Sequence, residues 1–212
     1  MSRWHNVFRV AAAVALVLGS SSILAAQKKP VTQALVVASV AGQPVAIIPI
    51  NMVVVEPTVP TGTMTADRPT LKTWTDSLLV EGALSRAPEV KWVPPAELRR
   101  ISRRGAGLVP DPDQMGQSIM RSWSLTTVPD PLRSNLRKLL AIAGGARYAL
   151  IPASLIFKAD STGALAADLS ILLADTRTGR VVWRSIAKGS GGTPDQVLGK
   201  AVATIFPVEG EP

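Results

Sequence analysis

Apolar and polar residues alternate toward the end of the chain, the pattern of β-strands with one buried face. Three such runs follow one another: residues 147–158, 164–175 and 180–188. A short polar segment that ends in glycine, first Gly163 and then Gly179, connects each run to the next. In a three-residue hairpin loop this position has a left-handed backbone, which glycine adopts without steric conflict. The pattern therefore predicts a three-stranded antiparallel meander with positive φ at both glycines.

These turns fix which residues face each other and therefore which side chains share a face. Ala153 is expected opposite Ile171, for example. One face then collects apolar side chains: Ile151, Ala153, Leu155, Phe157, Leu165, Ala167, Leu169, Ile171, Leu173, Val181 and Trp183. The other face collects polar ones: Ser154, Lys158, Asp168, Ser170, Arg184 and Lys188. We expect this polar face to meet water, with Asp168 and Lys188 as an exposed cross-strand ion pair.

Apolar residues at helical spacing predict five helices before and after the meander. They cover residues 67–87 and 96–104, a segment from about Met115 to Trp123 that Asp111 or Asp113 caps, residues 131–143 and residues 194–206. Asp130 is the expected N-cap of the fourth helix, and Thr193 forms a capping box with Gln196 at the fifth. Gly105 is the expected left-handed C-cap of the second helix.

Residues 30–55 carry no charge and are long enough to cross a bilayer. Pro49 and Asn51 interrupt the segment, and its many valines and isoleucines favour strands. We interpret it as two buried strands around a turn at residues 41–44, with a membrane-spanning helix as the alternative. A further short strand is expected at residues 90–93, where Pro94 ends it.

The first residues have the three zones of a secretory signal peptide. Arg3 and Arg9 precede an apolar run, Val10 to Leu18, and small residues follow up to Ala26. We interpret residues 1–26 as this signal. The alternative is an uncleaved anchor, although the apolar run is shorter than the roughly 20 residues of a spanning helix.

The chain after the predicted signal peptide is divided into three parts. Residues 27–44 are expected to form an extended segment or edge strand, residues 45–207 a single domain and residues 208–212 a flexible tail. The predicted fold class is α/β (α+β), with a mixed sheet whose C-terminal antiparallel meander packs against helices.

The composition excludes several kinds of chemistry. The chain has no cysteine and one histidine, His5, which lies in the predicted signal. Catalysis by Ser-His-Asp or Cys-His groups, thiolate or histidine zinc sites and disulfides therefore have no residues to work with. A lipid-acceptor cysteine is absent as well, so we expect an exported protein that is not a lipoprotein, is not an enzyme and needs no cofactor.

Two weaker catalytic hypotheses depend on the meander. Ser154 and Lys158 suggest a Ser-Lys hydrolase, but four residues along a strand span about 13 Å, too far for proton transfer. A catalytic loop at Asp175 and Thr176 is the alternative to a simple hairpin there, and we favour the hairpin.

One charged motif is a candidate binding site. The formal net charge is +8, and Arg99, Arg100, Arg103 and Arg104 repeat at helical spacing. This strip is suited to phosphate or carboxylate groups, and a solvated helix face is the alternative. Because we expect export, an anionic membrane surface or a cell-wall polymer is a better partner for it than nucleic acid.

The order of elements, with the motifs "VAIIPI" at residues 45–50, "GARY" at 145–148 and "DTRTGRVVW" at 175–183, resembles the amino-terminal domain of TolB. It is also similar to domains of curli-secretion and penicillin-binding-protein-activator lipoproteins. The resemblance implies an α/β domain of the periplasm that binds other proteins or forms assemblies. It brings no catalytic residue.

Taken together, these patterns favour an exported envelope protein without enzymatic activity, which acts through protein contacts as a scaffold or accessory subunit. The first alternative is a module that binds anionic lipid or cell-wall polymer through residues 96–104. The second is a hydrolase that lacks histidine. Neither the partner nor the oligomeric state follows from the sequence.

Overall fold

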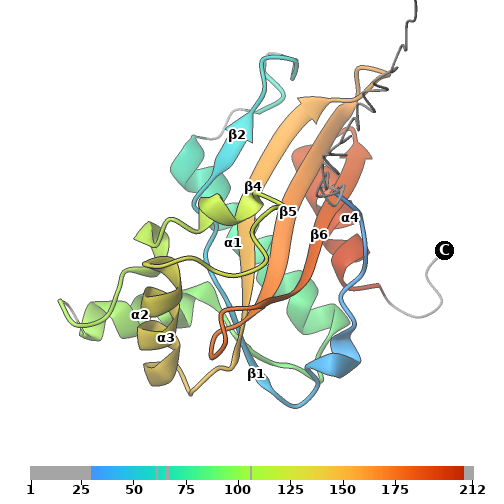
Figure 1. The fold of residues 1–212 in the computed structure, drawn as a ribbon. Helices are drawn as coiled ribbons and strands as arrows, with labels where there is room; N and C mark the ends of the chain where they lie inside the picture. The colour runs from blue at the N-terminus through green and yellow to red at the C-terminus, as the bar shows by residue number, and fades with distance from the viewer. Residues whose placement is uncertain (1–29, 61, 65–66, 106, 208–212) are drawn as a thin grey trace, which may run out of the picture.

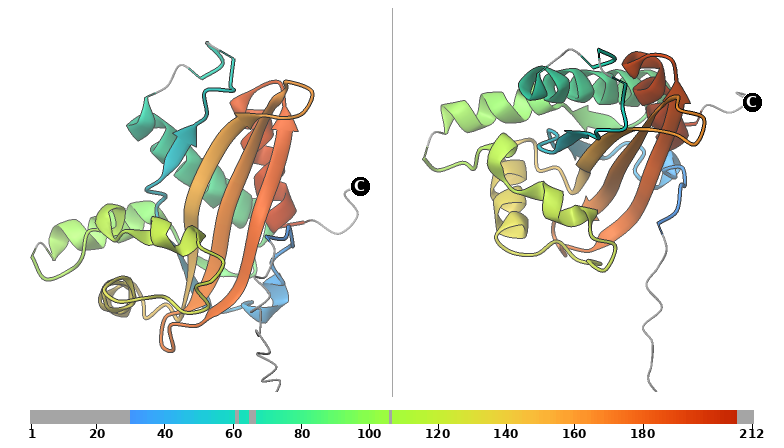
Figure 2. Two further views of the ribbon diagram at one scale, coloured as in Figure 1. Left: turned by 45° about the horizontal axis from the view of Figure 1, so that its top comes forward. Right: turned by 90° about the horizontal axis from the view of Figure 1, so that it is seen from above.

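The computed structural model describes residues 30–60, 62–64, 67–105 and 107–207. The predicted signal peptide, 1–26, and the predicted tail, 208–212, lie outside the described residues. One sheet forms the middle of the fold. Helices α1 and α4 cover one face of this sheet, while α2, α3 and 3-10 turns lie against the other (Figures 1 and 2).

The sheet is mixed, as the sequence predicts. Its strands are β1 (Pro44–Ile47), β2 (Val53–Val55), β3 (Lys91–Val93), β4 (Tyr148–Ala159), β5 (Leu165–Asp175) and β6 (Val181–Gly191). The order is β3-β1-β4-β5-β6, and β2 pairs with β4 beyond the end of β1. The pairs of β1 with β3 and of β1 and β2 with β4 are parallel, while β4, β5 and β6 form the antiparallel meander (Figure 1).

Four α-helices and three 3-10 turns complete the described part of the chain. They are α1 (Arg68–Arg86), α2 (Pro95–Arg104), α3 (Leu132–Ile142), α4 (Pro194–Ile205), η1 (Val37–Ser39), η2 (Pro112–Gln114) and η3 (Gln117–Arg121). The capping signal of α4 is confirmed, because Thr193 Oγ1 accepts a hydrogen bond from the Gln196 amide at 3.3 Å. Asp67 caps α1 in the same way, through the Thr70 amide at 2.9 Å.

Several expected local elements are wrong. Residues 35–41 contain the 3-10 turn η1 and no strand, and the segment from Met115 to Trp123 contains the 3-10 turn η3 in place of an α-helix. Gly105 ends α2 with φ −100°, so it is not a left-handed cap. Asp130 does not cap α3, because its carboxylate pairs with Arg133 at 2.7 Å.

The meander has the predicted turns, with φ +82° at Gly163 and +76° at Gly179. Its register follows the prediction from the first turn down to Ser154, and then a β-bulge shifts β4 by one residue. Pro152 stands next to the bulge. Because proline cannot donate to the ladder, a proline in a central strand commonly marks such an irregularity.

The bulge corrects the predicted faces of the sheet. Ile151 and Ala153 lie on the face of α2 and α3, whereas Leu169 and Trp183 remain together on the face of α1 and α4. Val181, expected on the same face as Trp183, also lies on the face of α2 and α3, because the pairing of β5 with β6 has a second register shift between Leu173 and Ala174. The expected pair of Ala153 with Ile171 is therefore wrong. Ile171 lies opposite Pro152 instead.

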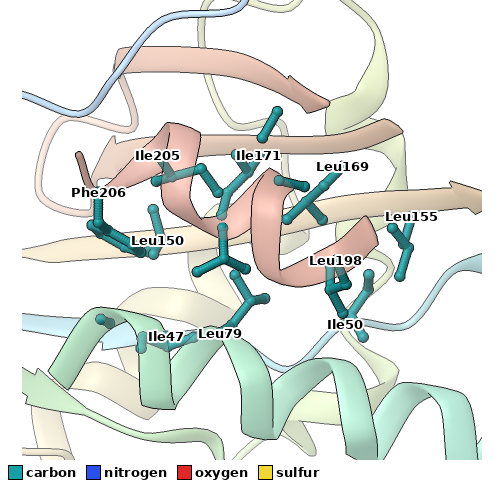
Figure 3. Packing of buried hydrophobic residues seen from close by; sticks show 14 of the residues in the cluster. Ile47, Ile50, Leu79, Leu150, Leu155, Leu169, Ile171, Leu198, Ile205 and Phe206 are labelled. Carbon is teal, nitrogen blue, oxygen red and sulfur yellow. The ribbon is translucent and has the colours of Figure 1, made fainter. Parts of the chain in front are cut away.

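Two cores result, one on each face of the sheet. In the α1–α4 core, side chains of α1 and α4 meet those of β1, β4 and β5, and Figure 3 shows Leu79, Leu198 and Phe206 among them. In the α2–α3 core, Leu98, Leu136 and their neighbours cover the opposite face. The face expected to meet water is thus covered over part of its area by apolar side chains.

The segment just before η1 runs along the outer edge of β6. The Ile186 amide donates to the carbonyl oxygen of Val31 at 3.0 Å, and Gln33 bonds through its amide to Ser185 Oγ at 2.9 Å. Trp183 Nε1 donates to the carbonyl oxygen of Ala34 at 2.8 Å. This segment therefore protects part of the edge of β6, although the division of the chain at residue 44 remains a prediction.

Candidate functional sites

The four arginines of the predicted strip lie on α2 and differ in their surroundings. Arg99 is tied into the fold: its guanidinium bonds to Asp113 at 2.7 and 2.8 Å and to Asp76 at 2.6 Å. Because these two carboxylates already occupy Arg99, it is not available to an anionic partner. The prediction of one continuous strip is wrong at this residue.

Asp76 explains why Arg99 turns inward. This residue of α1 is 4% exposed, and its Oδ1 accepts a hydrogen bond from the Ile50 amide at 2.8 Å. Burial raises the pKa of the Asp76 carboxyl to about 6, although the bonds from Ile50 and Arg99 act to lower it. The network joins α1, α2 and the η2 turn around one guanidinium.

The other three arginines face solvent. Arg100 pairs with Glu97 one helical turn away. Among the residues that the structure describes, Arg103 and Arg104 form no ion pair with a carboxylate. The part of the strip that remains open to a ligand is therefore the end of α2.

Positive charge is concentrated around this end of the molecule. Residues 95–147 contain nine basic residues: Arg99, Arg100, Arg103, Arg104, Arg121, Arg133, Arg137, Lys138 and Arg147. They contain four acidic ones: Glu97, Asp111, Asp113 and Asp130. Because α2 and α3 share one core and lie next to each other (Figures 1 and 2), the seven basic residues on these two helices belong to one region, which we call the basic α2–α3 region.

A second candidate site lies beside β6 and was not found from the sequence. It is a hollow of about 530 Å³ between the segment before η1, the loop after η3 and the start of β6. Arg184, Trp123 and Val182 line it, and we call it the Arg184 hollow. No local sequence pattern predicts this hollow, because its walls are formed by three segments that lie far apart in the sequence.

Apolar side chains are exposed around this hollow. Val31 is 46% exposed, Val182 52% and Val36 66%. Val182 and Trp183 also border a second hollow of about 420 Å³, which Val36 and Tyr148 help to line. The start of β6 therefore carries an apolar surface that borders two hollows, which we call the β6 surface.

The side chains named in the two catalytic hypotheses are either buried or bonded to other residues of the fold. Ser154 is 2% exposed, and Lys158 pairs with Asp168 at 2.5 Å. This ion pair replaces the expected one, although Lys188 does lie opposite Asp168 in the sheet. Asp175 accepts hydrogen bonds from two amides of its own hairpin loop and pairs with Arg147 at 2.9 Å.

Within the described ranges, no group of three or more acidic or histidine side chains is arranged to hold a metal ion. Over the same residues, no helix combines the length and the apolar character of a membrane span.

No protein-family model matches the chain, and neither does any curated protein sequence. Solved structures do match. The C-terminal domain of LpoB from Salmonella enterica is 19% identical over 72% of this chain and 84% of that chain, with a TM-score of 0.40. A PelC dodecamer from Paraburkholderia phytofirmans is 13% identical over 82% and 93%, with a TM-score of 0.39.

Lipoprotein GNA1162 from Neisseria meningitidis matches as well, at 13% identity over 70% of this chain and 81% of that chain, with a TM-score of 0.35. These matches agree with the general resemblance to lipoprotein domains that the sequence indicates. Because all three TM-scores lie below 0.5, we base the proposed function on the residues of this chain alone.

Proposed function

We propose that this chain is an exported accessory protein of the cell envelope, without enzymatic activity, which acts by binding another protein through the β6 surface. The observation that carries the proposal is the apolar surface at the start of β6. Val31, Val36 and Val182 are each close to half exposed or more, and Val182 lines both hollows.

Several features of this surface suit a protein partner. Aromatic and apolar side chains next to a cavity provide the anchors that protein interfaces use. Trp183 is held in place by its bond to the carbonyl oxygen of Ala34, so binding does not have to immobilise it.

The experiment is site-specific photocrosslinking in the cells that produce the protein. A photoreactive phenylalanine analogue replaces Val182 in one variant and Leu84 of α1 in the other. Leu84 is the matched control, because it is apolar and 54% exposed, against 52% for Val182. We expect an adduct with one defined protein from position 182 and none of this adduct from position 84.

Two results would contradict the proposal. One is the same set of adducts from both positions, which would indicate random collision. The other is recovery of the chain alone from position 182. In either case the β6 surface is not the binding site for a protein.

A second function is favoured by the charge distribution. Residues 95–147 have five more basic than acidic residues (9 − 4), whereas residues 30–94 and 148–207 together have one more (10 − 9). Such a concentrated charge attracts anionic lipid headgroups or cell-wall polymers. The exposed residues of this site are Arg100, which pairs with Glu97, and Arg103 and Arg104, which form no ion pair with a described carboxylate.

The test replaces these three arginines by glutamine and leaves Arg99 in place, because Arg99 joins α1 to α2. We expect weaker retention on vesicles that contain phosphatidylglycerol and on cell-wall fragments. The control replaces Lys72, Lys91 and Lys200, which removes the same charge elsewhere. Equal retention of both variants would refute a specific role of α2.

A further inference from the structure

Arg184 is the exception among the buried or half-buried arginines of the described chain. It is 8% exposed, on β6 opposite Leu172. Arg99 and Arg133 each pair with carboxylates, but Arg184 forms no ion pair with any described residue. Burial without a counter-charge lowers its pKa. A buried cation of this kind is normally paired, because removal from water is costly for a charge.

The contacts of Arg184 hold it in place without neutralising it. Nη1 donates to the carbonyl oxygen of Ser122 at 2.6 Å, and Nη2 donates to that of Leu125 at 3.0 Å. The guanidinium carbon lies 5.5 Å from the ring centroid of Trp123. Carbonyl dipoles and an aromatic face stabilise the cation partly, and they also fix the orientation of its planar group.

Two donors beside this hollow have no partner. Arg184 Nε and Trp123 Nε1 are both buried, and neither makes a hydrogen bond within the described part of the chain. Unpaired buried donors are rare, and each one calls for an explanation. An acceptor that carries negative charge would satisfy the donors and supply the missing counter-charge together.

We propose that the Arg184 hollow binds an acidic side chain of a partner protein, presented on an extended apolar peptide segment. This inference rests on the proposed function and names the chemistry of the partner. The acid is required by the uncompensated guanidinium of Arg184 and by the indole N–H of Trp123. The apolar flanks are required by the walls, to which Val31, Leu125 and Val182 contribute.

The shape of the site favours a peptide over an anionic surface. A lipid headgroup layer or a rigid polymer meets exposed charges, but Arg184 is 8% exposed and lies within a hollow of about 530 Å³. A single side chain on a flexible segment can enter such a space. The exposed basic residues of α2, in contrast, are suited to a surface.

The test is an NMR titration that follows the indole N–H signals of Trp123 and Trp183. The ligand is a short blocked peptide of alternating valine and glutamate, and the control ligand is the same peptide with glutamine. We expect saturable shifts of both signals with the glutamate peptide. We expect none at the same concentrations with the glutamine peptide.

Two substitutions of opposite charge at the exposed position 182 separate recognition of the acid from an effect on folding, because misfolding would weaken binding in both variants. Val182→Lys should lower the Kd for the glutamate peptide about threefold and Val182→Glu should raise it about threefold, the range of a partly exposed ion pair. The same changes at Leu84 are the control and should leave the Kd unchanged. Arg184→Gln should abolish saturation, whereas Arg177→Gln, with equal loss of charge, should not.

Several results would overturn the inference. Equal binding of both peptides, or equal Kd values for Val182→Lys and Val182→Glu, would show that the acid is not recognised. Shifts caused by phosphatidylglycerol vesicles but not by the peptide would identify an anionic surface as the ligand. Shifts that depend on protein concentration alone would identify a second copy of the chain.

This test is separate from that of the proposed function. A specific crosslink from position 182 together with no binding of the glutamate peptide would contradict only the acidic partner. No crosslink together with peptide binding would contradict the protein partner in the envelope, but not the carboxylate site.

Discussion

Asp76 provides a sharp test of the energetics of this fold. It is a buried carboxyl that faces an arginine, so burial and the ion pair act on its pKa in opposite directions. If burial dominates, the pKa is about 6 in the folded chain, against 3.8 for an unperturbed aspartate. The difference of about two units corresponds to about 3 kcal/mol, at about 1.4 kcal/mol for each unit.

The sign follows from proton binding. Between pH 3.8 and about 6, the folded chain holds a proton on Asp76 that the unfolded chain has released. The contribution of Asp76 to stability is therefore greatest below pH 3.8 and decreases by about 3 kcal/mol as the pH rises to about 6. Above that pH it stays constant.

The variant Asp76→Asn isolates this contribution, because the amide cannot ionise and its oxygen can still accept from the Ile50 amide. The measurement is urea unfolding of both proteins, followed by tryptophan fluorescence, at several pH values between 3.8 and 6. We expect the free energy of unfolding of the parent chain, relative to Asp76→Asn, to increase as the pH falls.

A relative stability that stays constant, or that decreases as the pH falls, would refute the reasoning. A decrease would mean that Arg99 and the Ile50 amide outweigh burial and hold the carboxyl in its ionised form. Comparison with the variant removes the effect of the other carboxylates, since both proteins share them.

Four further predictions concern packing and helix stability, and urea unfolding checks each of them. Gly189→Ala should destabilise the fold by about 1–3 kcal/mol, because a Cβ there would lie 1.9 Å from a backbone oxygen of α4. Gly199→Ala, at an open position of α4, should instead stabilise it by up to about 1 kcal/mol. Leu79→Ala should cost about 2–5 kcal/mol in the α1–α4 core, and the exposed Leu84→Ala less than about 0.5. Thr193→Ala should cost about 1 kcal/mol through loss of the α4 cap. A cost of Leu84→Ala equal to that of Leu79→Ala, or a stabilising Gly189→Ala, would contradict the described packing.

Much of the fold was predictable because its signals are local. The backbone conformations of Gly163 and Gly179 depend on the loop length and the residue alone, and the cap of α4 depends on Thr193 and its own first turn. The strand β3 and the helices α1 and α4 follow from periodic apolar residues and prolines near their ends. Such features need no contact with distant segments.

The candidate sites were less predictable, because each depends on what a side chain meets. The spacing of the four arginines places them on one helix, but the inward turn of Arg99 requires Asp76, which lies 23 residues earlier in the chain. Pro152 did indicate an irregularity in β4. The residues on both sides of it are apolar, so the sequence pattern did not show that Ile151 and Ala153 lie on the other face of the sheet.

The sequence by itself therefore determined the meander and its turns, the four α-helices of the described chain, the mixed α/β class and the absence of cysteine and of any histidine other than His5. Only the tertiary structure decided which faces of the sheet are buried, which arginines remain open and where Arg184 lies without a counter-charge. The physical reason is that hydrogen-bonded turns and caps are satisfied within a few residues. Burial and the pairing of charges are instead decided between segments that meet only when the chain is folded.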